Sequence, residues 1–299
     1  NIEGIIINKN DLNWTFNANV GINRNKLKKL NSNLDFQLGP SIGFSQAYPI
    51  LFMVDQPLGI YWGAETNGVY SSWEEANASG IAGAAPGEIR YINHHIDLDD
   101  SGQPLEIQEI NFDDYVKIGD PNPDFTYSIS NNFSYKNWDA NILFTGQKGG
   151  DLFWVDSWQL SGLQKTTNIL SSSYANSWIA PLYYENGNYI YDESIGNLSS
   201  VNHPGAMIET GSRAISSDRN IFDGSFIRLK NINIGYNFDL KDGKNMRVYL
   251  AGQNLVVWTD YPGYDPEVRT YTKNPQKRGV DFGTYPGTRS LLLGLKFNY

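Results

Sequence analysis

Residues 12–23 alternate between apolar and polar side chains without exception, which constrains the fold more than any other feature of the sequence. The apolar set is Leu12, Trp14, Phe16, Ala18, Val20 and Ile22, and the polar set is Asn13, Thr15, Asn17, Asn19, Gly21 and Asn23. A period of two predicts a β-strand with two chemically different faces. Strands of soluble proteins average about 5–6 residues, whereas a tilted strand that crosses a bilayer needs about 9–11. The length of this segment therefore favours a membrane-spanning strand.

The same alternation recurs over residues 125–136, 138–144 and 231–238. The polar positions are rich in Asn, Ser, Thr and Gly, which suit a wet lumen, and aromatic residues stand near the ends of the apolar positions. We expect about eight antiparallel strands, at residues 2–8, 12–23, 45–63, 124–136, 137–147, 225–238, 246–257 and 288–299. The third is the least regular, because Pro49 and Pro57 interrupt it.

Short and long connections alternate between these strands. Tight turns are expected at residues 136–139 and at the Asp242-Gly243 dipeptide, which is typical of hairpins. Long connections rich in Gly, Pro, Tyr, Trp and Asn cover about residues 64–123, 148–224 and 258–287. Outer-membrane barrels have short periplasmic turns and long external loops. The sequence therefore predicts an all-β fold, an antiparallel transmembrane β-barrel segment with these three stretches as external loops.

Composition excludes several other classes. The net charge of -9 and the absence of a Lys/Arg stripe argue against a nucleic-acid partner. Without cysteine, the chain can form neither disulfides nor thiolate metal sites. No nucleophile motif with a flanking base is present, and the adjacent carboxylates Asp113 and Asp114 do not by themselves indicate a glycosidase. We therefore expect a protein that is not an enzyme. The mean hydropathy of -0.44 is compatible with a barrel, which exposes only alternate residues to lipid.

An open sheet of long strands would leave backbone groups unpaired in lipid, at a cost of several kcal/mol each. The strands must therefore close into a barrel, either on their own or with further strands. The loops are too large for the simplest small barrels, and the chain begins abruptly at a strand. We therefore expect residues 1–299 to be the C-terminal portion of a larger barrel whose earlier strands lie outside this chain.

The last strand carries a pattern of its own. Gly294, Phe297 and Tyr299 have the Gly-x-x-aromatic-x-aromatic spacing that resembles the signal read by the barrel assembly machinery of the outer membrane. Leu292 stands where such signals usually carry a polar residue, which is a small departure.

Four collinear stretches make the resemblance more specific: GDPNPDFTYSISNNFSYKNWDANILFTGQKGGDLFW at 119–154, SFIRLKNINIGYNF at 225–238, RVYLAGQNLVVWTDYPGYDPEV at 247–268 and YPGTRSLLLGLKFNY at 285–299. Together they resemble the C-terminal third of SusC/RagA-type TonB-dependent transporters. That resemblance implies a barrel of about 22 strands in the outer membrane of a Gram-negative, Bacteroidetes-like bacterium.

The resemblance also implies a function. Such transporters import oligosaccharides or peptides beneath a SusD-like lipoprotein lid, with energy delivered through TonB. The plug domain and the TonB-contacting segment would lie in the absent N-terminal part, so this chain would contribute the barrel wall against outer-membrane lipids and the external loops.

The stretch 94–109, HHIDLDDSGQPLEIQE, is the nearest approach to a metal site. Asp97, Asp99, Ser101 and Gly102 match positions 1, 3, 5 and 6 of a calcium loop, where oxygen ligands alternate before a sharp turn. Position 12 is Gln108, so Glu106 or Glu109 would have to replace the missing acid. The two interpretations are a Ca2+ site and a solvated acidic external loop.

Aromatic residues gather in the long connections. Trp154, Trp158, Tyr261 and Tyr264 are the candidates for substrate or lid contact, with Trp178, Tyr183 and Tyr184 in the same class. The alternative is that these rings pack loop on loop and support the barrel rim.

Two other functions remain open at this point. A secreted carbohydrate-binding β-sandwich would also alternate, but it needs neither strands of this length nor a terminal aromatic residue. A barrel that docks other proteins in a larger envelope complex would share every feature above.

Overall fold

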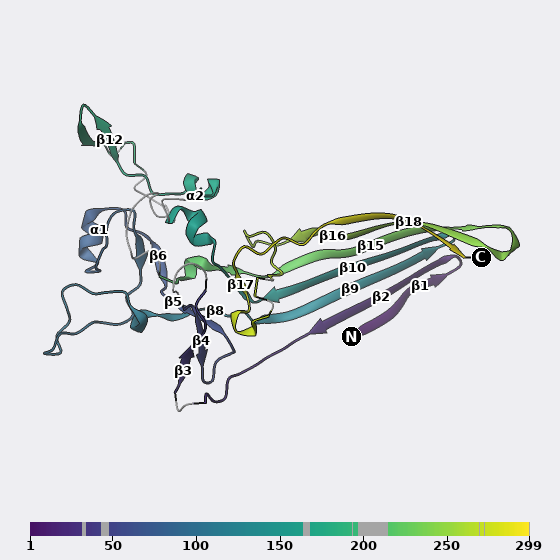
Figure 1. Cartoon of the computed structure of the whole chain (residues 1–299), viewed down its shortest axis with the longest axis horizontal. Coiled ribbons are helices and arrows are strands. Elements are labelled where there is room, and N and C mark those ends of the chain that lie inside the picture. The colour runs from purple at the N-terminus through teal and green to yellow at the C-terminus, as the bar shows by residue number, and fades with distance from the viewer. Residues whose placement is uncertain are drawn as a thin grey trace.

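Seven long strands form one antiparallel sheet in the computed structural model (Figure 1). In spatial order they are β1 (Ile2–Lys9), β2 (Leu12–Gly21), β9 (Pro123–Tyr135), β10 (Trp138–Gly149), β15 (Phe226–Asp239), β16 (Asn245–Trp258) and β18 (Ser290–Asn298). The structure describes residues 1–299 except 32–33, 43–47, 164–167, 193, 197–214, 269, 272 and 299. Seven of the predicted spanning strands are thus confirmed within one or two residues at most ends.

The predicted strand at 45–63 is wrong. The described part of this segment folds into two short strands, β4 (Ile50–Met53) and β5 (Ile60–Gly63), which pair antiparallel with each other. The turn between them contains Pro57, and Asp55 and Gly59 both adopt positive φ there. A proline-containing turn of this kind reverses the chain, so the segment cannot run across the sheet. The first long connection consequently begins at residue 22 instead of about 64.

Short turns lie at one end of the sheet and long connections at the other (Figure 1). Asn10 and Lys136 occupy left-handed positions, with φ of 52° and 51°, in the turns after β1 and β9. The turn after β15 is a 3-10 turn, η5 (Lys241–Gly243), that ends on Gly243 at φ 73°. The strict alternation of short and long connections is confirmed.

One face of the sheet is apolar and uncovered. The register places Val20 opposite Tyr127, Ile142 opposite Ile232, and Leu250 opposite Leu293 on this face. Leu291 and Leu293 keep 73% and 74% of their surface exposed. Large aliphatic side chains at such exposure are costly in water, whereas in a bilayer they contact acyl chains.

Aromatic side chains border this apolar face at both ends. Near the turns, Trp138 packs edge-on against Tyr236 with ring centroids 4.9 Å apart. Near the long connections, Phe144 lies 6.4 Å from Trp258. Such bands are typical of the two membrane interfaces, where amphipathic rings sit at the headgroups.

Asn131 is the single polar exception in the alternation of β9, and it lies on the apolar face opposite Phe16. The indole nitrogen of Trp14 donates a hydrogen bond to its side-chain oxygen at 3.1 Å. Trp14 of the neighbouring strand β2 thus gives the Asn131 side-chain oxygen a hydrogen bond, which it could not obtain from hydrocarbon.

The opposite face carries a hydrogen-bonded polar network near the turns. Arg247 donates to both carboxylate oxygens of Asp139, at 2.9 Å and 2.5 Å, and to the side-chain oxygen of Asn233 at 2.7 Å. The guanidinium also lies 4.9 Å from the ring centroid of Tyr249. Gly235 leaves room for this group, because a Cβ there would lie 2.4 Å from the guanidinium carbon.

The long connections, residues 22–122, 150–225 and 259–289, fold together beyond the strand ends, and we call them the loop assembly. Their strands are β3 (Phe36–Leu38), β4, β5, β6 (Thr66–Val69), β7 (Ile89–Tyr91), β8 (Val116–Gly119), β11 (Asp151–Trp154), β12 (Leu182–Glu185), β13 (Asn188–Tyr191), β14 (Ile221–Asp223) and β17 (Val280–Asp281). Their helices and helical turns are α1 (Trp73–Ala78), η1 (Phe112–Asp114), the π-helical turn η2 (Gln159–Leu163), α2 (Ser171–Ala175), η4 (Asp218–Asn220) and η6 (Pro275–Lys277). None of the helices in the described part of the chain is both long and apolar enough to cross a membrane.

The loop assembly has a hydrophobic core of its own, to which all three connections contribute. Its buried members are Ile42, Ile50, Tyr61, Phe153, Val155, Trp158 and Val280. The small sheets bring these segments together, since β11 pairs with β14 on one side and with β17 from the last connection on the other. The connections are therefore one packed body rather than separate loops.

Candidate functional site in the loop assembly

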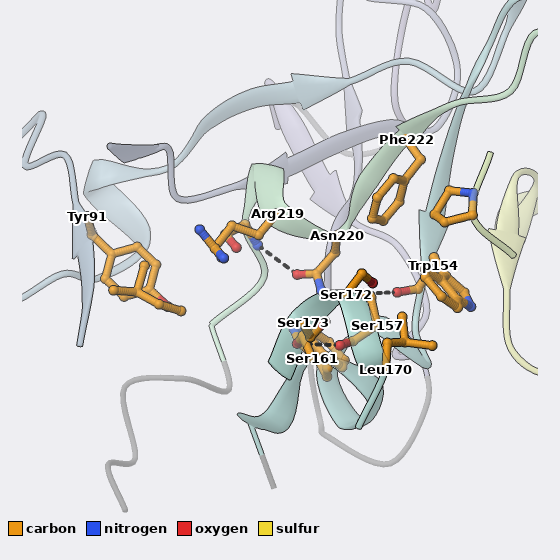
Figure 2. Close-up of a pocket in the computed structure, with 14 residues that line it drawn as sticks. Tyr91, Trp154, Ser157, Ser161, Leu170, Ser172, Ser173, Arg219, Asn220 and Phe222 are labelled. Carbon is orange, nitrogen blue, oxygen red and sulfur yellow. Dashed lines mark hydrogen bonds between the residues drawn. The ribbon is translucent and has the colours of Figure 1, made fainter. Parts of the chain in front are cut away.

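A cavity of about 210 Å³ lies between β11, η2, α2 and η4 (Figure 2). The rings of Tyr91, Trp154 and Phe222 form part of its wall, with the guanidinium of Arg219 and the amide of Asn220 among them. Several hydroxyl groups also face it: Ser157, Ser161, Ser172, Ser173 and Ser217.

Hydrogen bonds within the wall already engage much of this polar surface. The amide of Asn220 donates to the hydroxyl of Ser157 at 2.8 Å, and that hydroxyl donates to the carbonyl of Trp154 at 2.5 Å (Figure 2). The lining contains no histidine and no carboxylate among the described residues, so its serines have no general base. The cavity can hold a small group, but its lining lacks the parts of a hydrolytic site.

Three of the four candidate aromatic residues are buried in the loop assembly. Trp154, Trp158 and Tyr261 keep only 7%, 7% and 4% of their surface exposed. Trp154 packs edge-on against Tyr261, at a centroid distance of 6.1 Å. These positions fit the alternative that the rings pack loop on loop and offer little surface to a substrate or lid. Tyr264, at 78% exposed, is the candidate that solvent and a partner can reach, and its role stays a prediction.

Tyr261 also ties the last connection together. Its hydroxyl donates to Asp281 at 2.6 Å, and burial raises the pKa of the Tyr261 phenol far above its ordinary value. The phenol is therefore protonated at any physiological pH and remains a donor. Asp281 in turn accepts from the backbone amide of Thr284 at 2.9 Å.

A buried cation, Arg228, clamps the last connection to β15. It is 3% exposed, and its guanidinium donates to Asp265 at 2.5 Å. Its Nε lies 2.9 Å from Glu267, close enough for an ion pair although not aligned as a hydrogen bond. Asp265 also accepts from the backbone of Gly287 at 3.1 Å. The stretches 225–238 and 247–268 thus meet in a single ion-paired cluster.

Sequence reasoning missed this clamp, although one signal was present. In the pairing of β15 with β10, the register shifts between Leu229 and Asn231, and Lys230 is the extra residue. This shift places Arg228 on the polar face. An arginine between the apolar neighbours Ile227 and Leu229 needs a carboxylate when it is buried. The partners Asp265 and Glu267, however, are 37 and 39 positions away, and only the fold brings them close.

Asp114 is a second functional position that the sequence did not identify. Its carboxylate is fully buried, and it accepts hydrogen bonds from the backbone amides of His94, His95 and Asn111 at 2.9, 2.9 and 3.0 Å. An anion that collects three backbone donors stabilises an irregular loop much as a bound ion would. The adjacent acid, Asp113, is exposed.

We expect Asp114→Ala to remove the acceptor of three partly buried backbone amides, at about 1–3 kcal/mol in total because water can reach the donors. Residues 94–111 should then open more often, and limited proteolysis should cut them about tenfold faster. Asp113→Ala removes a neighbouring charge from solvent and should leave the cleavage rate unchanged. Equal rates for the two variants would contradict this role of Asp114.

The predicted calcium ligands do not converge in the structure. Asp99 accepts from the backbone amide and hydroxyl of Ser101 at 2.8 and 2.6 Å, and the hydroxyl bond holds the pKa of its carboxyl below the usual value. Asp97 accepts instead from the backbone of Glu109 at 3.0 Å, and Glu106 is exposed. Within the described part of the chain, no three acidic or histidine side chains are grouped as metal ligands. The calcium hypothesis therefore stays a prediction.

Calcium binding at this loop has a direct test. If calcium binds, a chelator should speed proteolysis of residues 94–109, and added Ca2+ should reverse this effect in the unmutated protein. In the double variant Asp97→Ala, Asp99→Ala, added Ca2+ should have no effect. Equal cleavage with and without chelator would leave the acidic-loop interpretation.

The candidate assembly signal lies at the edge of the sheet. Gly294 sits opposite Tyr249 in β16, and Phe297 projects on the apolar face with 58% of its surface exposed. A Cβ at position 294 would lie 2.3 Å from the Tyr249 ring, so this glycine is required by packing within the barrel wall. Tyr299 lies outside the described residues.

Comparison with known proteins gives two relatives along nearly the whole chain. A TonB-dependent receptor of Formosa agariphila is 32% identical over 306 residues, covering 98% of this chain and 27% of that receptor. A second receptor of the same organism is 25% identical over 308 residues, covering 98% and 28%. The TonB-dependent receptor SusC of Bacteroides thetaiotaomicron is 31% identical over 133 residues, which are 38% of this chain and 12% of SusC. The chain spans little more than a quarter of the length of the first two. No protein-family model matches it.

Among solved structures, the RagAB peptide transporter has the same fold, with a TM-score of 0.69 at 18% identity over 99% of this chain and 28% of that one. The closed-closed and open-open states of the RagAB peptide importer each give 0.66. The prediction of a segment of a SusC/RagA-type β-barrel is confirmed, and the alternative of a secreted β-sandwich, which is a different fold, is wrong. These relatives are receptors and transporters by name, in agreement with the expectation that the chain is not an enzyme.

Proposed function

Since this chain belongs to the SusC/RagA-type TonB-dependent receptors, we propose that it forms the C-terminal barrel wall and external loops of an importer in the outer membrane of a Bacteroidetes-like bacterium. The importer carries oligosaccharides or peptides under a SusD-like lipoprotein lid. The remaining strands, the plug and the TonB contact belong to parts of the protein outside this chain.

The observation that carries the proposal is the contrast between the two faces of the seven-stranded sheet. The apolar face exposes Leu291, Leu293 and Leu295 to the surroundings, which suits lipid and not water. The other face carries Asn, Ser, Thr and an Asp139–Arg247 ion pair, which suits a wet passage.

The loop assembly supplies the external part of the proposed importer. Its shared core fixes the three connections relative to one another, and a packed body offers a firmer partner surface than separate mobile loops. Exposed aromatic side chains on it, among them Tyr184, Tyr189 and Tyr264, suit contact with a lid protein.

Uptake by intact cells tests the proposal. Cells that lack the full-length receptor should fail to take up one class of labelled substrate, either oligosaccharides or peptides, and deletion of TonB should cause the same loss. Restoring the receptor should restore uptake. Unchanged uptake of both classes would contradict import and favour a barrel that serves as a docking subunit of a larger envelope complex.

Insertion through the barrel assembly machinery gives a further prediction. Tyr299→Ala should lower the outer-membrane level of the receptor several-fold, because the last strand carries the assembly signal. The amount of receptor in washed outer membranes measures this, with Tyr285→Ala, an exposed loop position, as the control. Equal levels in the two variants would argue against an assembly role for Tyr299.

A further inference from the structure

A second and larger cleft, of about 710 Å³, opens where β2 ends and β9 begins. Segments that follow β2 and precede β9 form one side, and residues 268, 271 and 274–280 of the last connection form the other. The volume falls within the range of about 300–1,000 Å³ typical of small-molecule sites.

The composition of this cleft differs from that of the chain as a whole. Its lining includes six side-chain amides, from Asn23, Asn25, Gln37, Asn122, Asn274 and Gln276. Two cations, Lys277 and Arg278, join them, and the described lining includes no carboxylate. In a chain with 32 acidic and 23 basic residues, a cleft with cations and no acids is an electropositive exception. Charge complementarity therefore favours an anionic ligand.

The backbone around Arg278 is held rigidly. Its carbonyl accepts a hydrogen bond from the buried hydroxyl of Tyr61 at 3.0 Å, and the carbonyl of Gly279 accepts one from the amide of Phe153 at 2.9 Å. Gly279 adopts φ 72°, and a Cβ there would lie 2.4 Å from the Tyr61 hydroxyl. The next residues pair as β17 with β11. The fixed backbone places the exposed Arg278 side chain at the cleft.

Neither cation of the cleft forms an ion pair within the described part of the chain. The ion pairs of the described residues involve neither Lys277 nor Arg278. The ammonium of Lys277 lies 4.4 Å from the ring centroid of Tyr271, which orients it without cancelling its charge. Both positive charges are thus available to a ligand.

The amides of the cleft fall into two groups, those that hydrogen-bond to other protein side chains and those that are open to a ligand. Asn25 donates to Asn122 at 2.9 Å, and Asn122 donates to Asp120 at 2.7 Å, so these two side chains stabilise the wall of the cleft. Asn23, Gln37 and Gln276 are exposed at the cleft. A side-chain amide both donates and accepts, as does the hydroxyl group of a sugar.

Aromatic rings complete the set of contacts. Phe52 and Tyr271 line the same cleft, and flat rings suit the apolar faces of sugar rings. A peptide chain would instead require an exposed strand edge or a row of side-chain pockets. The combination of amides, rings and cations favours a saccharide that carries negative charge.

An adjoining cavity of about 170 Å³ shares Asn23, Asn122 and Arg278 with the cleft. It reaches the ends of β2 and β9, where Gly21 and Thr126 are paired on the polar face and Ile22 and Phe125 belong to the apolar positions. The cleft therefore adjoins the end of the barrel wall from which the long connections extend.

On the basis of the proposed function, we infer that this cleft binds an acidic oligosaccharide, one that bears carboxylate or sulfate groups. Arg278 and Lys277 hold the anionic group, and the amides with Tyr271 and Phe52 hold the sugar rings.

Calorimetry on the full-length receptor with its lid protein, purified in mild detergent, tests the assignment. The probes are a galacturonic acid trimer, its neutral methyl ester, a sulfated galactose trimer and trialanine. We expect one of the two acidic saccharides to bind. The neutral ester and trialanine should each bind at least tenfold more weakly. Arg278→Gln should weaken binding of the acidic saccharide at least tenfold. Arg289→Gln, an equal change of charge at an exposed position beside β18, should not.

Three results would overturn the inference: equal binding of the neutral ester, binding that Arg278→Gln leaves unchanged, or no binding of either acidic saccharide. Binding of trialanine alone, with loss in Arg278→Gln, would assign the cleft to peptide carboxylates and reject the saccharide. Outer-membrane insertion and TonB-dependent uptake are measured on the same variants. A receptor that inserts and imports while failing these tests refutes the ligand assignment alone, and a receptor that does neither refutes the proposed function.

Discussion

Arg228→Met is expected to destabilise the loop assembly by about 3–5 kcal/mol, the usual consequence of removing one partner from a buried ion pair. The side chain of Asp265, which is 6% exposed, would lose the guanidinium that now lies at 2.5 Å. The loss should appear as a lower free energy of unfolding in denaturant titrations of the purified receptor. The rate of proteolysis within residues 259–289 gives a second measurement.

Lys230→Met is the matched control for Arg228→Met. The ammonium of Lys230 lies 3.5 Å from Glu267, but its side chain is 33% exposed, so the pair is screened by solvent. We expect this variant to lose less than about 1 kcal/mol. If Arg228→Met were no less stable than Lys230→Met, the clamp would not hold the last connection to β15.

Gly294→Val is expected to prevent most of the receptor from assembling. The added Cβ would lie 2.3 Å from the Tyr249 ring, so this half-buried ring, which also lies against the Arg247 guanidinium, would have to move. Overpacking of this kind costs about 1–3 kcal/mol, a factor of roughly 5 to 150 in an equilibrium constant. The heat-modifiable band in outer-membrane extracts measures the assembled fraction.

A double variant separates this packing effect from a general effect of losing glycine. Adding Tyr249→Ala to Gly294→Val should restore part of the assembly, because the ring that clashes is gone. Normal assembly of Gly294→Val would refute the requirement for space at this position.

The long strands could be predicted because their signal is local. A period of two over about ten residues reports which side of a strand meets lipid, and it held from β2 to β18. The prediction for residues 45–63 failed for an equally local reason that was given too little weight: Pro57, with Asp55 and Gly59 at positive φ, turns the chain back between β4 and β5. Asn131 shows the limit of the pattern, because only the strand register reveals that Trp14 donates a hydrogen bond to its side chain.

The site was harder to predict, because it depends on contacts between distant segments. Trp154 and Tyr261 looked like surface aromatics, but both are buried in a hydrophobic cluster that the second and third connections form together. Arg228 lies in β15 and Asp265 in the last connection, and the sequence gives no measure of the distance between them. The electropositive cleft likewise combines Asn23 after β2 with Arg278 before β17, a juxtaposition that only the fold creates.

The most direct test of the account asks which residues of β10 face lipid. The chain has no cysteine, so Asn141→Cys, Ile142→Cys, Leu143→Cys and Phe144→Cys each give one labelling site within it. A fluorescent label is attached to the full-length receptor in vesicles that contain brominated lipid. We predict strong quenching at 142 and 144, and weak quenching at 141 and 143. Equal quenching along the strand, or none at any position, would contradict a barrel wall in the membrane.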